Sequence, residues 1–339
     1  MPESRPRISV VMPCYNDGGF IDEALDSLAA QTVQDFEVIV VDDGSTDAAT
    51  REVLDGLRRP RTRLLRSADN RGPGAARNLG LAEARGELLC ALDADDRLSP
   101  RYLEATLAAL EAEPALTWAS TWLHMFGAES WIRRQDRCDL AALLADCTVH
   151  GAALVRLEPV RAAGGYDAAM REGNEDWDLW LRLAERGHRG TIVPEPLFHY
   201  RRRAGSLSTV TLARANHLRL ISALLDKHRD SLVAHLDEVL ALKDAEAVEH
   251  LTAAERLQTL SDEFLAPATV SRREELHVLA ARVAELRAPR AAAAASTETE
   301  IAVAAARHEV AALRRSLSWR ITAPLRAAWD LLRGRRPTW

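Results

Sequence analysis

The chain has 339 residues and a formal net charge of −6, and 47% of its residues are apolar. This length fits one large α/β domain with additional segments and excludes a disulfide-stabilised miniprotein, while the apolar fraction excludes wholesale disorder. The net negative charge of the chain argues against nucleic acid as a binding partner. Residues 311–339 differ from the rest, because seven arginines and one aspartate give them a local charge of +6.

The cysteine pattern and the hydropathy of the sequence predict the cellular compartment of the protein. The four cysteines form no C-x-x-C pair and have no histidines at metal-ligand spacing, which is typical of reduced thiols in a cytoplasmic protein. The first seven residues are polar, so we expect no signal peptide. No window approaches 18 uninterrupted apolar residues, so we also expect no membrane-spanning helix.

Apolar runs and stretches of helical period alternate over the first third of the chain. The pattern predicts strands at 8–12, 36–41, 63–66 and 87–92, and helices at 20–30, 46–57, 73–84 and 99–113. Ser99 and Pro100 are typical of a helix N-cap and the first helical position. This alternation predicts an α/β fold with a mostly parallel central sheet covered by helices on both faces.

Beyond a strand predicted at 116–126 the pattern loosens until about residue 205, and it then becomes helical. We therefore predict four parts. They are a catalytic domain at 1–210, a helical extension at 211–268, heptad-like helices at 269–318 and a basic amphipathic tail at 319–339. The heptads are too short for a confident coiled coil, so residues 269–318 could equally form a helical hairpin, or they could hold a second copy of the chain.

Polar clusters follow three of the predicted strands, where a parallel sheet binds ligands. They are Pro13-Cys-Tyr-Asn16, Asp42-Asp43-Gly-Ser-Thr-Asp47 and Asp93-Ala-Asp-Asp96. Two aspartates one residue apart can share a divalent cation, and carboxylate oxygens suit Mg²⁺ or Mn²⁺. A D-x-D motif alone also fits a solvated turn, so both interpretations stand at this point.

A dinucleotide or P-loop site is excluded, since neither glycine signature occurs. The stretch Asn70-Arg-Gly-Pro-Gly-Ala-Ala-Arg-Asn78 places glycines around a proline at a predicted helix start. Either Arg71 or Arg77 lies close to a diphosphate together with the helix N-terminus, or this helix start only packs against the sheet.

Taken together, the motifs resemble those of family 2 glycosyltransferases. The resemblance rests on Ile8–Asn16, Gln31-Thr32, Asp35–Asp47, Asn70–Asn78 and Leu92–Asp96, followed by Gly164-Gly-Tyr-Asp167, Glu175-Asp176 and His199-Tyr-Arg201. These motifs occur in order and cover roughly residues 7–208. The resemblance implies a GT-A fold, a nucleotide-diphosphate sugar donor, a divalent metal (Mn²⁺ or Mg²⁺) and inversion at the anomeric carbon.

The resemblance also implies roles for individual residues. Asp176 would be the general base, with Glu175 beside it. Asp95 would hold the metal, with Asp96 as an alternative ligand and Asp93 either on the ribose or donor sugar or on the metal. The residues expected to bind the donor are Pro13, Tyr15, Asn16, Asp43, Arg71, Arg77 and Asp93.

Further candidates lie in the second half of the domain. Trp177 either stacks on an acceptor sugar or packs in the core, whereas the helical spacing of Trp180 favours the core. His150 lines the acceptor side or is structural. Arg201 and Arg203 could reach the diphosphate or the acceptor side, and His199 is the remaining histidine candidate for the metal, because Arg203 stands where family members often carry histidine.

The sequence therefore predicts non-processive sugar transfer to a glycan or lipid-linked acceptor in bacterial surface polysaccharide or cell-envelope synthesis. Residues 316–326 resemble the ending of bacterial surface-polysaccharide glycosyltransferases. Arginines border an apolar stripe at Leu325, Trp329 and Leu332, which suits a helix on the inner face of the plasma membrane, although docking against protein fits as well. The alternatives are a sugar-phosphate nucleotidyltransferase and a degenerate scaffold protein.

Overall fold

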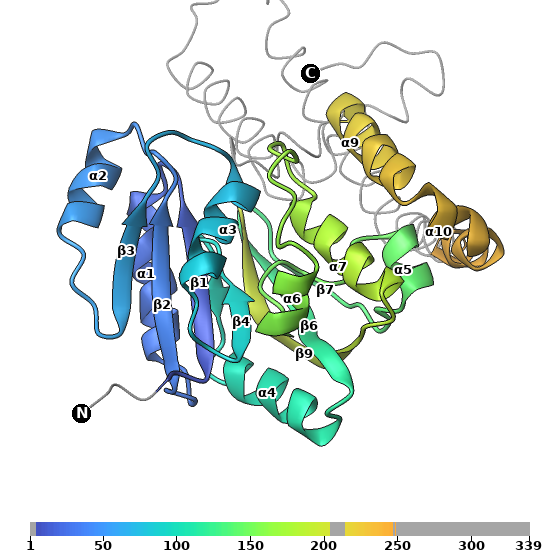
Figure 1. Cartoon of the computed structure of the whole chain (residues 1–339), viewed down its shortest axis with the longest axis horizontal. Helices are drawn as coiled ribbons and strands as arrows, with labels where there is room; N and C mark the ends of the chain where they lie inside the picture. The colour runs from blue at the N-terminus through green and yellow to red at the C-terminus, as the bar shows by residue number, and fades with distance from the viewer. Residues whose placement is uncertain (1–4, 204–213, 247, 249–339) are drawn as a thin grey trace, which may run out of the picture. The chain divides into compact units, whose positions relative to one another are not determined.

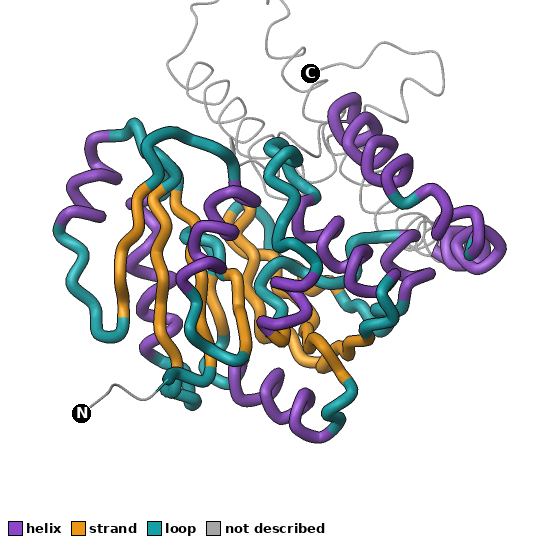
Figure 2. The backbone as a smooth tube through the Cα atoms, viewed as in Figure 1, coloured by secondary structure: helices purple, strands orange, loops and turns teal. Residues whose placement is uncertain are grey.

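A computed structural model describes residues 5–203, 214–246 and 248 of the chain. These residues form an α/β fold in which helices cover both faces of one sheet (Figures 1 and 2). The strands are β1 (Ile8–Cys14), β2 (Phe36–Asp42), β3 (Thr62–Arg66), β4 (Leu88–Ala91), β5 (Arg97–Leu98), β6 (Leu116–Gly127), β7 (Trp131–Arg133), β8 (Leu154–Arg156) and β9 (Arg189–Arg202). The helices are α1 (Gly18–Ala29), α2 (Ala48–Asp55), α3 (Pro73–Glu83), α4 (Tyr102–Ala112), α5 (Leu140–Ala145), α6 (Leu157–Ala162), α7 (Glu175–Glu185), α9 (Arg214–Lys227) and α10 (Arg229–Ala234).

The sheet has a parallel half and a mixed half. Its order is β3-β2-β1-β4-β8-β6-β9-β5, with β7 paired to β6. Strands β3, β2, β1 and β4 are all parallel, as the alternation of strands and helices predicted. Beyond β4 the pairs of β8 with β4 and β6 are antiparallel, while β6 and β9 are parallel. The carboxyl ends of β2, β1 and β4 therefore lie side by side at one edge of the sheet.

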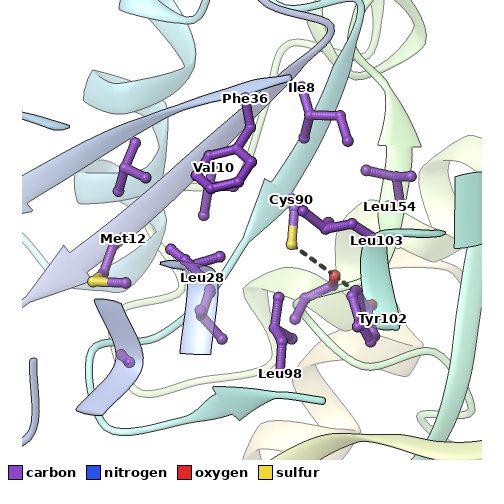
Figure 3. Packing of buried hydrophobic residues seen from close by; sticks show 14 of the residues in the cluster. Ile8, Val10, Met12, Leu28, Phe36, Cys90, Leu98, Tyr102, Leu103 and Leu154 are labelled. Carbon is purple, nitrogen blue, oxygen red and sulfur yellow. Dashed lines mark hydrogen bonds between the residues drawn. The ribbon is translucent and has the colours of Figure 1, made fainter. Parts of the chain in front are cut away.

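Alternate residues of the buried strands contribute to two separate cores. Val10 and Met12 of β1 pack toward α1 and α4, where Leu28 and Leu103 are buried (Figure 3). Val11 points to the other face and packs with residues of α3, α5, α6 and α7. Because both faces are covered, β1 and β2 are apolar along nearly their whole length, which made them easy to recognise.

The start of α4 corrects one local prediction. Ser99 does not cap the helix, which begins at Tyr102. Its hydroxyl instead lies 2.7 Å from Nε2 of His199, because Ser99 follows β5, which pairs antiparallel with β9.

The described part of the predicted helical extension packs against α7. His228 precedes α10 and is 3% exposed, and its two ring nitrogens lie 2.8 Å from a carboxylate oxygen of Glu185 and 3.1 Å from one of Asp178. Lys227 adds an ion pair of 2.6 Å to Asp178. These contacts join the extension to the helix that begins with Glu175.

Other predictions concern residues that the structure does not describe. The heptad-like helices at 269–318 and the basic tail at 319–339 lie outside the described residues and remain predictions. Within the described ranges, no helix is long and apolar enough to cross a membrane.

The His228 cluster predicts a pH-dependent contribution to stability. Burial alone would lower the pKa of His228, but its hydrogen bonds to Asp178 and Glu185 outweigh burial and raise that pKa. A raised histidine pKa stabilises the fold at pH values below the ordinary pKa, and this stabilisation is lost as the pH rises through the folded value. We expect His228→Gln to lower the free energy of unfolding by about 2 kcal/mol near pH 6, and by less near pH 9.

Urea denaturation at both pH values measures this difference. The matched control is His217→Gln, since His217 is a half-buried histidine of α9 outside the cluster. A loss of stability that is the same at both pH values would contradict a charged His228.

Candidate active site

Hydrogen bonds join the loops that follow β1 and β2. Asn16 has a positive φ of 57°, which turns its side chain toward the second loop. Its Oδ1 accepts from the backbone N–H of Thr46 at 2.8 Å and of Asp47 at 2.9 Å. The backbone N–H of Asp43 in turn donates to the carbonyl of Cys14 at 2.9 Å. The structure thus brings together the first two polar clusters that the sequence singled out.

A surface hollow of about 410 Å³ opens beside these loops. Tyr15 lines it and is 38% exposed, while Pro13 lies within β1, opposite Val41 of β2. The remaining lining residues come from the end of β2 and the loop after it, from α2, and from the end of β3 and the loop after it, and they include Ser45, Thr46, Arg66 and Asn70. Tyr15 is therefore the predicted donor residue that a ligand in this hollow would touch directly.

Asp43 holds the start of α3. Its carboxylate is buried and accepts from the backbone N–H of Arg71 at 3.1 Å and of Gly72 at 2.8 Å. Gly72 has a φ of 90°, a conformation that glycine adopts at little cost, and Pro73 follows as the first residue of α3. The carboxylate therefore fixes this helix start, and the side chain of Arg71 remains exposed at the surface.

Arg77 connects the two halves of the site. It is buried on α3, where its guanidinium forms an ion pair with Glu175 through Nη1 and another with Asp93 through Nη2, the second at 2.6 Å. The ring of Tyr166 lies 5.5 Å from the guanidinium carbon. Arg77 thus joins the first aspartate of the D-x-D sequence to the Glu-Asp pair, instead of lying exposed to a diphosphate.

The Glu-Asp pair begins α7. Gly173 and Asn174 both have positive φ and turn the chain into the helix. Its acidic first turn is favoured by the helix dipole. Burial raises the pKa of Glu175 to about 7 against the opposing effect of Arg77. Burial likewise raises the pKa of Asp176, whose Oδ1 accepts from the backbone N–H of Trp177 at 2.8 Å.

Gly151 faces the other oxygen of Asp176, and its importance was missed from the sequence. A Cβ atom at this position would lie 3.2 Å from Oδ2 of Asp176 and 3.9 Å from Nη2 of Arg77. Only a hydrogen atom fits there without pressing on the carboxylate. No sequence pattern pointed to it, because a single glycine after His150 has many explanations.

Arginines from β9 and the residue that follows it hold the acidic loop. Nε of Arg203 lies 3.0 Å from Oδ2 of Asp95, and Nη2 of Arg203 forms an ion pair with Asp17. The backbone N–H of Arg201 donates to Asp96 at 2.7 Å, and its Nε donates to the carbonyl of Asp95 at 2.7 Å. Both arginines therefore contact the acidic loop, and Asp17 is a partner that the sequence did not indicate.

His199 does not join the acidic loop. Its Nε2 contacts Ser99, and its Nδ1 lies 3.1 Å from Nδ1 of His124. Burial, together with His124, lowers the pKa of His199 to about 4. Both ring nitrogens are thus used by neighbours, which contradicts its expected role as a metal ligand in this arrangement.

The other predicted metal ligands do not form a metal site with one another. Asp93 pairs with Arg77, Asp95 pairs with Arg203, and Asp96 is 2% exposed and accepts from a backbone N–H. Among the residues that the structure describes, no three His, Cys, Asp or Glu side chains are grouped to hold an ion. In this conformation the three carboxylates expected to bind the metal therefore contact arginine side chains and a backbone amide.

The two remaining acceptor-side candidates are buried. Trp177 is 4% exposed and donates from Nε1 to the carbonyl of Leu143 at 2.6 Å, so of the two alternatives for this residue the structure supports packing in the core and not stacking on a sugar. Trp180 is in the core, as its spacing indicated. His150 is 8% exposed, stacks on Phe198 at 4.3 Å, and has its pKa lowered to about 3 by burial. The structural interpretation of His150 therefore fits better than a place on an open acceptor surface.

The sheet order and the acidic loop beside its parallel half define the GT-A class of nucleotide-sugar transferases, and comparison with known proteins agrees. Residues 9–160 match the family described as Glycosyl transferase family 2. The putative glycosyltransferase EpsE of Bacillus subtilis is 30% identical over 207 residues, which is 58% of this chain and 74% of EpsE. The succinoglycan biosynthesis protein ExoO of Rhizobium meliloti is 30% identical over 233 residues, covering 63% of this chain and 65% of ExoO. The chain therefore belongs to glycosyltransferase family 2.

Solved structures share the fold. TarS residues 1–349 of S. aureus in complex with UDP-GlcNAc align with a TM-score of 0.57 and 20% identity, covering 69% of this chain and 73% of that one. The mannosyltransferase PcManGT of Pyrobaculum calidifontis, in complex with GDP-Man and Mn²⁺, aligns with a TM-score of 0.53 and 22% identity, covering 92% of this chain and 88% of that one. At this identity the likeness concerns the fold.

Arg77 should be required for stability. Lysine at this position keeps the charge but lacks the planar fork that holds two carboxylates, so one buried carboxylate would lose its partner. We expect Arg77→Lys to lower the free energy of unfolding by about 3 kcal/mol, as measured by urea denaturation. The control is Arg186→Lys at the exposed residue that follows α7, and equal effects of the two substitutions would contradict the role of Arg77.

Gly151 should be required for activity rather than for folding. The Cβ of Gly151→Ala would press on Asp176, so we expect sugar transfer to fall about tenfold while the thermal midpoint changes little. Gly19→Ala is the matched control, because a Cβ at Gly19 meets nothing within 4 Å. If both alanine variants transfer sugar at the wild-type rate, Gly151 does not keep the space beside Asp176.

Proposed function

We propose that this chain transfers one sugar per encounter, with inversion, from a nucleotide-diphosphate sugar to a hydroxyl of a glycan or lipid-linked acceptor. The observation that carries the proposal is the ion-paired bridge Asp93–Arg77–Glu175. The bridge joins the loop expected to bind the donor to Glu175, the neighbour of the carboxylate expected to act as the base, Asp176, and this supports the proposal.

The chemistry matches the charges of this site. In an inverting step the acceptor oxygen attacks the anomeric carbon, the bond from that carbon to the diphosphate oxygen breaks, and the electron pair leaves with the diphosphate. The proton of the acceptor hydroxyl passes to a carboxylate within hydrogen-bond reach, for which Oδ2 of Asp176 is placed beside Gly151. Burial raises the pKa of Asp176, which makes its carboxylate a stronger proton acceptor than an ordinary aspartate.

The donor side is assigned to the hollow beside Tyr15. A nucleoside there could stack on the exposed ring of Tyr15, while its diphosphate extends toward Asp93, whose side chain is 38% exposed. The structures of TarS with UDP-GlcNAc and of PcManGT with GDP-Man support a nucleotide-sugar as the donor of this chain. The residues expected to bind the donor then either contact the nucleotide or shape this hollow, and they are Pro13, Tyr15, Asn16 and Asp43.

A divalent cation was predicted as the cofactor, and the PcManGT complex contains Mn²⁺. In this chain each carboxylate of the acidic loop already has an arginine or amide partner, as described above. The residues present do not fit a metal in this conformation, so no step of the proposed reaction is derived through one.

The acceptor is proposed from the relatives. ExoO is named for succinoglycan biosynthesis, and the chain is also 27% identical over 239 residues to the chondroitin synthase of Pasteurella multocida. Both names concern polysaccharides, which supports a growing glycan or its lipid-linked precursor as the acceptor. Attachment to a membrane surface through residues 319–339, and self-association through residues 269–318, remain predictions.

A donor screen followed by one substitution tests the proposal. Nucleotide-sugars are first tested for thermal stabilisation of the full chain, and the donor found is then assayed for transfer to glycan acceptors. We expect Asp176→Asn to reduce transfer at least about a thousandfold, since the amide cannot take the proton. The stabilisation by the donor should persist, because the substitution does not alter the donor hollow.

The control is Asp226→Asn, an exposed substitution on α9 that should leave transfer unchanged. Full activity of Asp176→Asn would contradict its role as the base. Release of pyrophosphate instead of a nucleoside diphosphate would indicate a nucleotidyltransferase, and the absence of any donor-dependent reaction would indicate a scaffold protein.

A further inference from the structure

We propose that the exposed ring of Trp131 on β7 is a subsite for the acceptor glycan, where it stacks on the sugar next to the one that carries the attacking hydroxyl. This inference rests on the proposed function and names the chemical class of acceptor that the site takes, a glycan of at least two sugars. The ring also supplies the stacking contact that the sequence suggested for Trp177, which is buried.

Exposure distinguishes Trp131 from the other tryptophans. Of the five tryptophans that the structure describes, Trp131 is the one that is exposed, at 45%. The ring of Trp122 lies 5.2 Å from the guanidinium carbon of Arg134 and is partly buried. The three buried rings are those of Trp118, Trp177 and Trp180. A pyranose has an apolar face of C–H groups, and an open indole can cover that face while the hydroxyls at its rim keep their hydrogen bonds.

The position of Trp131 on β7 relates the ring to the proposed base. Trp131 and Arg133 are two residues apart on the strand, so both project from the same face, about 7 Å apart along it. Arg133 forms an ion pair with Asp146, the residue that follows α5. Burial raises the pKa of Cys147, the next residue, and the charge of Asp176 adds to this rise while Arg133 opposes it. The face of β7 that carries Trp131 therefore also carries the side chain that reaches the segment beside Asp176.

Partly exposed polar groups connect the ring with the base. The side chains of Arg133 and Asp146 are 28% and 36% exposed. A guanidinium offers hydrogen-bond donors and a carboxylate offers acceptors, so the pair can bind sugar hydroxyls in either sense. Gly151 keeps the space beside Oδ2 of Asp176, where the attacking hydroxyl has to lie. A glycan bound across these residues has its attacking sugar at Asp176 and its next sugar on Trp131.

The charge around the ring favours a glycan over a membrane surface. Residues 129–139 contain three arginines and three carboxylates, so their net charge is zero. A segment that binds an anionic leaflet has an excess of basic residues instead. The indole Nε1 of Trp131 donates to Oε2 of Glu129 at 3.2 Å. This carboxylate at the edge of the ring can accept a hydrogen bond from a sugar hydroxyl, whereas anionic lipid would repel it.

Steady-state kinetics of the full chain test the proposal. The donor found by thermal stabilisation is assayed with methyl glycosides and with tetrasaccharides of glucose, galactose, mannose and N-acetylglucosamine as acceptors. For the tetrasaccharide that the wild type uses best, we expect Trp131→Ala to raise KM about tenfold with kcat unchanged, because the ring contacts the acceptor equally before and during the reaction. The KM of the matching methyl glycoside should change less than about twofold, since a single sugar at the base does not reach the ring.

Two substitutions on the same strand are the matched controls. Trp131→Phe keeps a flat ring, so most of the affinity for the tetrasaccharide should be retained. Ile132 is as exposed as Trp131, at 45%, but projects from the opposite face of β7, so Ile132→Ala should leave both KM values unchanged. The dissociation constant of the donor should be the same in all variants, because none of them alters the hollow beside Tyr15. A merely structural role of Trp131 would weaken the methyl glycoside and the tetrasaccharide alike, and that result would overturn the subsite.

Four further results separate the hypotheses. Equal KM values of wild type and Trp131→Ala for the tetrasaccharide would overturn the subsite and leave the proposed function standing. A wild type that binds a donor but transfers to no tetrasaccharide would do the same. An equal loss of sedimentation with phosphatidylglycerol vesicles in Trp131→Ala and Ile132→Ala would identify a membrane contact in place of the sugar subsite. Failure of every nucleotide-sugar to stabilise the wild type would overturn the proposed function itself.

Discussion

The contact on which the site depends is the double ion pair of Arg77. One buried guanidinium joins Asp93, which follows β4, to Glu175, the first residue of α7. A buried charge is tolerated only when its partners remain in place, so the loop and the helix are fixed relative to each other. In the proposed reaction this contact would set the distance between the donor and the base, a distance that an in-line displacement requires to be short and constant.

The same principle explains why α7 is held from its other side. Asp178 and Glu185 contact His228 and Lys227 of the helical extension, so α7 has ion pairs toward the acidic loop and toward the extension. The helix whose first turn contains the proposed base is thereby fixed on both sides. Its placement depends on segments that are far from Asp176 in the sequence.

Sequence reasoning succeeded where a local pattern determines the structure. Buried strands such as Phe36–Asp42 and the turn at Gly72-Pro73 follow from apolar runs and from the φ values that glycine and proline favour. It failed where partners come from distant segments. Trp177 has the same helical spacing whether it faces solvent or the core, and the partners of Arg77 and Arg203 are determined only when β9 and α7 pack beside the parallel half of the sheet.

The two arginines of the site also show why burial, more than residue type, determines their roles. Arg77 and Arg203 each contact two carboxylates, yet only one of them is open to solvent. A fully enclosed guanidinium can position its neighbours but cannot follow charge that develops on a ligand. The acidic loop is therefore held by two arginines in different surroundings, an enclosed one at Asp93 and a partly exposed one at Asp95.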